Sequence, residues 1–393
     1  MRKLWSLVIV GVLLLAAHPA SRAASSSSDW PSLGSDAAQS NDNAAETAIT
    51  AHNVLKLKVR WTAPIADVSY PIVVAGRVYV PMVSHAHIHV WVLDAATGKR
   101  LSVIFRDAPG GMLMVGGNLY VAGRYLQEVD PAKGTRLSRI DATPSTANGV
   151  FLYPVADQKL LVAGYASLTP GASASLYAIA PGSNQVLWTV PSSSAQGAIG
   201  SGRILTQTAR GSDFYDESTG KKIATASRVS SDWFAGDLLA YSVASIKRGK
   251  VTLYAMDGTG ATIWKRAIGP AFRSTYRWPH ALDSSAVYVQ TLTPQPGIAA
   301  LNPESGSVLW TRPLADVQRM VLANGLLFVL TYALGQPTRL VVFHADTGAP
   351  IGALALSPGY YAFNADDGLM VADGMVFIRA VGPHGSQLVA LGP

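Results

Sequence analysis

The sequence Asp-Ala-Ala-Thr-Gly-Lys-Arg-Leu-Ser, from Asp94 to Ser102, decides the fold because versions of it return along the whole chain. They lie at Asp130–Ser138, Ala180–Trp188, Asp216–Ala224, Asn302–Trp310 and His344–Gly352, and a copy that is one residue shorter runs from Asp257 to Trp264. A spacing of about 40 residues between copies indicates a repeat architecture. We therefore predict that the chain is built from repeated units of one kind.

The residues around each copy are typical of short strands. Two stretches rich in β-branched and aromatic residues precede the first copy, Gly76–Val80 and Val90–Leu93, and equivalents precede most of the others. This composition, with a period of two, indicates β-structure. The glycine of the copy supplies the positive φ of a tight turn, and the leading Asp or Asn caps that turn through its side chain. Each repeat is thus predicted to be a small antiparallel sheet.

The number of copies and the two chain ends predict a closed ring. Seven copies begin at residues 94, 130, 180, 216, 257, 302 and 344, and Leu388–Leu391 matches the strand that would precede an eighth. Leu57–Thr62 resembles the strand after a copy, although no copy precedes it. We expect this N-terminal strand to complete the last sheet and join the two ends. The fold class is therefore predicted as an all-β, eight-bladed β-propeller, or a seven-bladed one if Ile204–Thr225 forms no blade.

The N-terminal region has the features of an export signal. Arg2 and Lys3 precede an apolar stretch, Leu4–Ala17, that is shorter than the roughly 20 residues of a membrane span. Small residues then favour cleavage after Ala23, and the alternative is an uncleaved anchor helix. We predict a signal peptide at residues 1–23, an extended leader at 24–53 that is exposed or partly disordered, and a propeller at 54–393 in the periplasm or outside the cell.

Composition excludes several classes of site. The chain has no cysteine, so disulfides, zinc–thiolate sites and thiol nucleophiles are all excluded. The net charge is +7, and because residues 1–23 contain three basic and no acidic residues, the exported chain would carry 7 − 3 = +4. The basic residues are scattered, without a run of five. We expect no nucleic-acid partner, no stable membrane insertion after cleavage, and a monomer.

The copies resemble the pyrroloquinoline quinone (PQQ) type of β-propeller repeat, as in Leu93–Leu101 and Leu301–Trp310. In that family the last position of the copy is a tryptophan that docks between neighbouring blades. The resemblance assigns this structural role to Trp61, Trp188, Trp264 and Trp310. The equivalent positions Ser102, Ser138, Ala224 and Gly352 have lost the tryptophan. The leader is also similar to exported members, through Asp29–Gly34, Glu46–Ile49 and Asn53–Leu57.

The resemblance offers two kinds of function without deciding between them. Quinoprotein dehydrogenases of this family hold PQQ between a tryptophan and a vicinal disulfide, beside a calcium ion bound by carboxylates and an Asn. The assembly scaffold BamB is anchored as a lipoprotein through a cysteine. The absence of cysteine removes both of these features here. PQQ with calcium therefore stays an alternative cofactor, and the first expectation is that no cofactor is bound.

Two segments are candidates for ligand contacts. Residues 271–280 are dense in aromatic and basic side chains that suit an anionic or sugar-like ligand or a partner loop, namely Arg273, Tyr276, Arg277, Trp278 and His280. The alternative is a structural loop. His85, His87 and His89 alternate along a predicted strand and are weak candidates for metal ligands, since residues i and i+2 of a strand lie roughly 7 Å apart. No catalytic motif or carboxylate pair stands out, so catalytic residues stay unassigned.

These observations lead to one functional prediction and two alternatives. We expect an exported, non-enzymatic propeller that serves as an interaction platform for a protein or a cell-envelope ligand. The first alternative is a PQQ-dependent dehydrogenase or PQQ-binding protein. The second is a carbohydrate-binding or carbohydrate-cleaving propeller, which only aromatic residues such as Trp233, Tyr276 and Trp278 favour.

Overall fold

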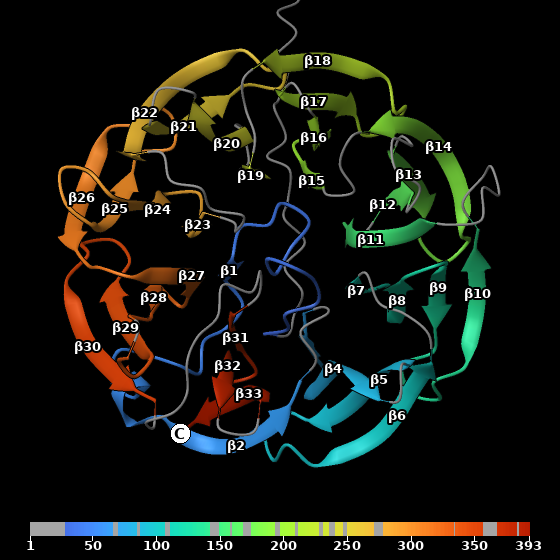
Figure 1. The fold of residues 1–393 in the computed structure, drawn as a ribbon, viewed down its shortest axis with the longest axis horizontal. Helices are drawn as coiled ribbons and strands as arrows, with labels where there is room; N and C mark the ends of the chain where they lie inside the picture. The colour runs from blue at the N-terminus through green and yellow to red at the C-terminus, as the bar shows by residue number, and fades with distance from the viewer. Residues whose placement is uncertain are drawn as a thin grey trace, which may run out of the picture.

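The computed structural model is a ring of β-sheets around a central axis (Figure 1). It describes residues 28–393 except 66–69, 85–86, 107–110, 142–148, 158, 168–173, 193–196, 209–210, 228–230, 236–239, 247–249, 271–277, 334, 357–367 and 383–384. The strands of this part of the chain form eight sheets, seven of four strands and one of five. Within each sheet the strands follow one another from the axis to the rim in chain order, apart from the two N-terminal strands.

The first four sheets use the chain consecutively. The first contains β3 (Ile72–Val74), β4 (Arg77–Ser84), β5 (His87–Asp94) and β6 (Arg100–Arg106), and the second β7 (Gly111–Val115), β8 (Asn118–Ala122), β9 (Leu126–Val129) and β10 (Arg136–Ile140). The third contains β11 (Gly149–Ala156), β12 (Leu161–Ser167), β13 (Ala174–Ala180) and β14 (Gln185–Ser192), and the fourth β15 (Gly197–Gly200), β16 (Arg203–Thr208), β17 (Gly211–Asp216) and β18 (Lys222–Ser227).

The last four sheets continue the same order. The fifth contains β19 (Ser231–Ala235), β20 (Ala240–Ile246), β21 (Lys250–Met256) and β22 (Thr262–Pro270), and the sixth β23 (His280–Leu282), β24 (Val287–Thr291), β25 (Gly297–Leu301) and β26 (Val308–Pro313). The seventh contains β27 (Val317–Ala323), β28 (Leu326–Thr331), β29 (Arg339–His344) and β30 (Pro350–Ala355), joined on its inner edge by β1 (Asp42–Asn43). The eighth contains β31 (Leu369–Ala372), β32 (Met375–Gly382), β33 (Gly385–Gly392) and β2 (Lys58–Pro64), and a short 3₁₀ helix, η1 (Val54–Lys56), precedes β2.

The N-terminal strand closes the ring, as predicted. Strand β2 pairs antiparallel with β33, from Lys58 opposite Gly392 to Pro64 opposite Gln387. The first and last parts of the propeller therefore share one sheet, and unfolding of either end must break this pairing. The divergent fourth repeat also forms a sheet, since β16 to β18 span residues 203–227. The strands thus provide no support for the alternative in which this repeat is left out.

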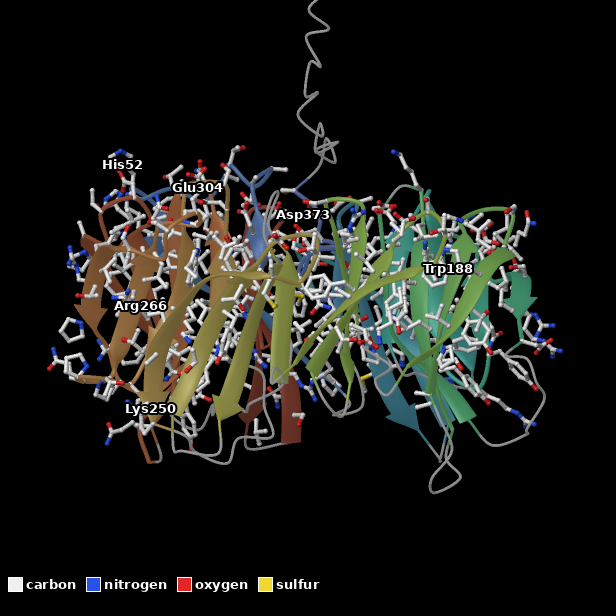
Figure 2. All side chains as sticks on the ribbon, turned by 90° about the horizontal axis from the view of Figure 1, so that it is seen from above. His52, Trp188, Lys250, Arg266, Glu304 and Asp373 are labelled. Atoms are coloured by element: carbon white, nitrogen blue, oxygen red, sulfur yellow. The ribbon has the colours of Figure 1, made fainter. Side chains whose placement is uncertain are left out.

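Two turn types connect the strands. The first and second strands of the first sheet are joined by Ala75 and Gly76, whose φ angles are +51° and +70°. Positive φ at both central residues is the signature of the tight hairpin turn that matches the twist of the strands. The repeated sequence forms the turn between the third and fourth strands, where Asp94 Oδ1 accepts hydrogen bonds from the Thr97 amide at 2.8 Å and its hydroxyl at 2.7 Å. Figure 2 shows Glu304, which lies in such a turn, at the same face of the disc as Asp373, and we call this the turn face.

The hydrophobic core is divided among the spaces between neighbouring sheets. Between the second and third sheets, for example, Leu113 and Tyr120 of the second sheet belong to the same buried cluster as Phe151 and Tyr177 of the third. Burial of these faces supplies the main stabilising free energy. Exposed aliphatic side chains are found mainly on the outermost strands, such as Leu137 at 52% exposure on β10. The fold is therefore held together sheet against sheet around the axis.

Most residues of the described part of the leader, 28–53, are buried or half-buried, which corrects the expectation from its polar composition. Trp30 and Leu33 are 1% exposed, and Glu46 is 0% exposed. In Figure 1 this N-terminal segment, in blue, crosses the middle of the ring. Composition was misleading because polar side chains and backbone groups here bond to the inner strands of the sheets rather than to water.

Candidate functional sites

The leader is bonded to inner strands around much of the ring. Its backbone exchanges hydrogen bonds between Trp30 and Val73 on β3, and it receives one from Met114 on β7 to the Pro31 carbonyl at 2.8 Å. Further backbone bonds link it to the fourth, sixth and seventh sheets, at Ile199, Leu282 and Leu322. The side-chain amide of Asn43 donates to the Val371 carbonyl on β31 at 2.8 Å, which adds the eighth sheet. The leader thus ties six of the eight sheets together at the axis.

The predicted ligand segment at residues 271–280 is only partly described. Arg273, Tyr276 and Arg277 lie outside the described residues. Trp278 is 5% exposed and its Nε1 donates to the Gln290 carbonyl at 3.0 Å. His280 is 4% exposed, and Asn41 of the leader donates to its carbonyl at 3.0 Å. The two described members therefore contribute to the packing of the sixth sheet and the leader.

The histidine candidates do not assemble into a described metal centre. His85 lies outside the described residues, and of His87 only the backbone is described, within β5. The Nδ1 atom of His89 is buried and has no hydrogen-bond partner in the described part of the chain. Among the described residues no group of three or more His, Asp or Glu side chains is placed to hold a metal ion. Within the same residues no helix is long and apolar enough to cross a membrane.

Four tryptophans join neighbouring sheets through the repeated turn. A Cβ atom added to Gly98, Gly220, Gly306 or Gly348 would come within 2.6, 2.5, 2.6 and 2.6 Å of the rings of Trp61, Trp188, Trp264 and Trp310, respectively. Each indole Nε1 also donates to the carbonyl of the second residue of that turn, at Ala95, Glu217, Pro303 and Ala345. The ring thus covers the turn glycine while its N–H is satisfied, a combination that suits a buried tryptophan.

The junctions without tryptophan use other side chains in its place. Ile104 lies against Gly134 between the first and second sheets, and Phe214 lies against Gly260 between the fourth and fifth. Leu55 of η1 packs against Gly352 on β30, at the junction between the seventh and eighth sheets. The sequence showed the losses but did not show which residues compensate for them.

The junction between the second and third sheets is polar. Glu128 on β9 is 4% exposed and accepts hydrogen bonds from Asn118 at 2.6 Å, Tyr120 at 3.2 Å and Ser138 at 3.1 Å. Asn184, from the turn of the third sheet, also donates to Glu128, at the oxygen that accepts from Ser138. Burial raises the pKa of Tyr120 to about 12, so its hydroxyl stays a donor at neutral pH. A buried carboxylate with this many donors is stable without a ligand.

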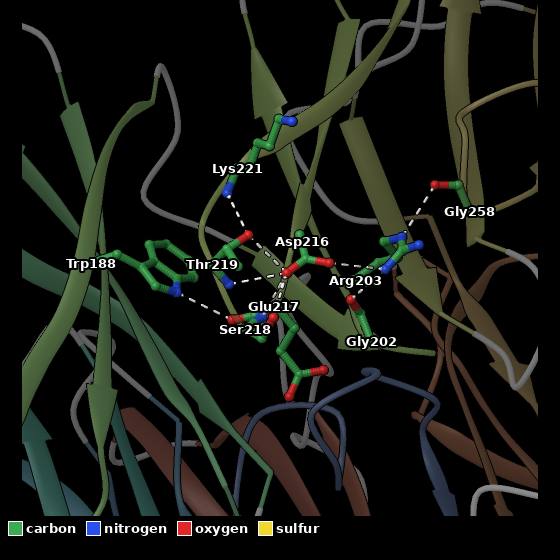
Figure 3. A network of polar contacts seen from close by, with 9 residues as sticks. All are labelled: Trp188, Gly202, Arg203, Asp216, Glu217, Ser218, Thr219, Lys221 and Gly258. Atoms are coloured by element: carbon green, nitrogen blue, oxygen red, sulfur yellow. Dashed lines mark hydrogen bonds and ion pairs between the residues drawn. The ribbon is translucent and has the colours of Figure 1, made fainter.

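A second polar network surrounds the turn of the fourth sheet (Figure 3). Hydrogen bonds from the hydroxyl groups of Ser218, at 2.6 Å, and Thr219, at 2.9 Å, lower the pKa of Asp216. Arg203 links this turn to the fifth sheet, since its Nη1 lies 3.4 Å from Asp216 Oδ2 and its Nε donates to the Gly258 carbonyl at 3.4 Å. The network therefore connects two sheets across the turn face.

Among the described residues, Glu217 in the same turn has a carboxyl group whose pKa is raised strongly. Burial, followed by the charge of Asp157 and a hydrogen bond with it, raises the pKa of Glu217 to about 7. Asp157 belongs to the third sheet's turn between β11 and β12. A neighbouring negative charge and burial both disfavour the charged form of the Glu217 carboxyl group. This pair is a titratable contact between sheets rather than an assembled catalytic site.

Comparison with known proteins agrees with this architecture. The family model described as "Outer membrane protein assembly factor BamB" matches residues 247–368. The quinohemoprotein alcohol dehydrogenase ADHIIG from Pseudomonas putida HK5 has a TM-score of 0.64 and 13% identity, over 93% of this chain and 80% of that chain. A europium-containing methanol dehydrogenase has a TM-score of 0.60 and 11% identity, over 93% of this chain and 98% of that one.

BamB from Moraxella catarrhalis is similar at a TM-score of 0.54 and 13% identity, over 86% of this chain and 100% of that chain. No curated protein sequence matches the chain. At such low identities the solved structures establish the fold alone, since one fold serves many functions.

Proposed function

We propose that this chain, which is similar to the BamB-like PQQ-repeat propellers, is an exported, non-enzymatic platform that binds a protein or a cell-envelope ligand. The observation that supports this most is the leader, which is bonded to six sheets at the axis. A propeller whose centre is occupied by its own chain offers its faces and rim for binding. The N-terminal sequence, with Arg2 and Lys3 before an apolar stretch, supports export.

The residues present do not fit PQQ in the way the related dehydrogenases are expected to hold it. Those enzymes place the quinone against a vicinal disulfide, and this chain contains no cysteine. Among the described residues no cluster of carboxylates is placed for a calcium ion. The similarity to ADHIIG therefore supports the fold and not the cofactor.

The first test is site-specific photo-cross-linking of the purified chain without residues 1–23. A cross-linking amino acid replaces Glu304 on the turn face, Lys250 near the opposite face or Leu187 on the rim (Figure 2 labels the first two). Incubated with envelope extract, at least one position should give a discrete adduct that excess unlabelled chain abolishes. Absence of a competed adduct at all three positions would contradict the platform proposal.

The second test addresses the cofactor directly. PQQ with calcium should leave the melting temperature unchanged. A ligand that bound the native state would instead add about 2.7 kcal/mol of stability at a hundred times its Kd. A saturable rise in melting temperature together with a change in quinone absorbance would favour the dehydrogenase alternative instead.

A further inference from the structure

The outermost strands have a charge composition unlike the rest of the chain. The whole sequence contains 24 acidic residues against 31 Lys and Arg. The eight outermost strands contain no Asp or Glu, and their basic residues are Lys58, Arg60, Arg100, Arg106, Arg136, Arg139, Lys222, Lys265, Arg266 and Arg312. Negative charge is placed elsewhere, for example at Asp94, Asp216 and Glu304 in the repeated turns. The outermost strands therefore carry charge of a single sign.

The basic residues are concentrated on one arc. Six of them belong to β2, β6 and β10, the outermost strands of three consecutive sheets, which follow one another along the lower right of the ring in Figure 1. The five remaining outermost strands share the other four. We call β2, β6 and β10 the basic rim. Like charges gathered on one arc raise the local concentration of an anionic partner.

Aliphatic side chains stand between these charges. Leu101 and Val103 on β6 are 50% and 47% exposed, and they lie on the same side of the strand because side chains alternate. Val59 on β2 is 43% exposed between Lys58 and Arg60. A partner that matches the basic rim must therefore present both negative charge and small apolar groups.

Strand β6 also offers a backbone edge. It is the last strand of its sheet, and within the described part of the chain β5 is the strand that pairs with it. Edge strands are commonly protected from pairing by charged residues, but either sign would serve that purpose. Exclusive use of Lys and Arg repels a second copy of this rim and at the same time admits an acidic strand.

We propose that the basic rim binds an acidic, extended polypeptide segment, which adds as a strand to the outer edge of β6. Main-chain hydrogen bonds would supply affinity, while carboxylates opposite Lys and Arg and apolar side chains opposite Leu101 and Val103 would supply selectivity. This inference rests on the proposed platform function and names the chemistry of its partner.

The present contacts of the basic rim are weak enough to exchange. The guanidinium group of Arg100 lies 4.8 Å from the ring centre of Trp91, and that of Arg139 lies 4.3 Å from the ring centre of Tyr125. Arg139 also contacts Asp141 at 2.9 Å, but these two side chains are 43% and 51% exposed. Ion pairs between exposed groups contribute about 1 kcal/mol or less, so an incoming carboxylate can replace Asp141.

The test uses three labelled nine-residue peptides and fluorescence anisotropy. One alternates Glu and Val, the second alternates Lys and Val, and the third alternates Glu and Pro, which keeps the charge but removes every second backbone N–H group and disfavours strand pairing. The Glu–Val peptide should bind at least thirtyfold more tightly than the other two, and added salt should weaken its binding. Equal binding of the Glu–Val and Lys–Val peptides would overturn the proposal, as would equal binding of the Glu–Val and Glu–Pro peptides.

Variants locate the site. Val103→Asp, and separately Lys58→Glu with Arg136→Glu, should weaken binding of the Glu–Val peptide at least tenfold, while Lys265→Glu on β22 should leave it within twofold. Melting temperatures show that each variant is folded. Equal weakening by Lys265→Glu would contradict an assignment to the basic rim, and binding to vesicles of phosphatidylglycerol without peptide binding would assign the rim to lipid instead.

The two proposals fail in different ways. A competed cross-linked adduct that Val103→Asp does not affect, together with no peptide binding, would disprove the strand addition and leave the platform function standing. Peptide binding that depends on Val103, together with no competed adduct at Glu304, Lys250 or Leu187, would leave the strand addition standing and disprove the envelope partner.

Discussion

The hydroxyl group of Ser138 accepts a hydrogen bond of 2.7 Å from the side-chain amide of Asn184. Ser138 ends one copy of the repeated sequence, at the position that holds a tryptophan in other copies. Asn184 stands in the next copy, at the position that holds the turn glycine in other copies. Asn184 retains the positive φ of that position, at +58°. An indole that covers the turn requires a glycine beneath it, so the loss of one member is accommodated by the loss of the other.

Coupling between these positions can be measured. Asn184→Gly removes two donated bonds from a half-buried junction and should cost about 1–3 kcal/mol. Ser138→Trp alone should also destabilise, because the Asn184 side chain occupies the space of the ring. Together the two changes should cost at least about 1 kcal/mol less than their sum. Urea unfolding of the four proteins gives the interaction free energy, and strict additivity would refute the pairing.

The tryptophan–glycine junctions predict a second effect. Gly348→Ala would place a Cβ atom 2.6 Å from the Trp310 ring at a φ of +65°, whereas Gly325 has a φ of +69° and no atom within 4 Å of an added Cβ. Gly325→Ala therefore reports backbone strain alone, about 1 kcal/mol. Gly348→Ala should cost a further 1–3 kcal/mol or so because of overpacking. Equal losses in urea unfolding would show that the indole can move aside freely.

The leader should behave as part of the core. Asn43 is 4% exposed and donates to the carbonyls of Ser28, Asp29 and Val371. Asn43→Leu keeps the approximate volume but removes the bonds donated by the Asn43 side chain, at a cost of about 1–3 kcal/mol. Limited proteolysis should then cut the leader sooner, while His52→Ala, at an exposed position, should change neither stability nor cleavage. A leader that is cut equally fast in all three proteins would not be integral to the ring.

Stability should depend on pH through Glu217. Burial and Asp157 raise the pKa of Glu217 to about 7, so the folded chain keeps a proton that the unfolded chain has already lost. The stabilising contribution of this proton to the free energy of unfolding is fully present below about pH 4.5. It is lost as the pH rises through about 7. Glu217→Gln should flatten the stability profile over this range, with exposed Glu304→Gln as its matched control. Unfolding curves at pH 5 and pH 8 provide the check, and parallel profiles for Glu217→Gln and the unaltered chain would exclude this carboxyl group as the cause.

Much of the propeller could be predicted from local sequence. Strands such as Val90–Leu93 and the turn at Asp94–Ser102 are specified by residues adjacent in the chain, through propensity, capping and the need for positive φ. The innermost strands were not identified in advance, and several of them, such as Ile72–Val74 and His280–Leu282, are too short for a period of two to stand out. The docking tryptophans could be named from the repeat, but their glycine partners and carbonyl acceptors required the three-dimensional arrangement.

The sequence by itself determined the repeat, the strand and turn chemistry of each sheet, and closure of the ring through Leu57–Thr62. Only the tertiary structure decided the route of the leader, the exchange of a tryptophan–glycine pair for Ser138 and Asn184, and the gathering of basic residues on β2, β6 and β10. The physical reason is distance along the chain. Turns and strands arise from neighbouring residues, whereas Asn43 meets Val371 only after every intervening sheet has taken its place around the axis.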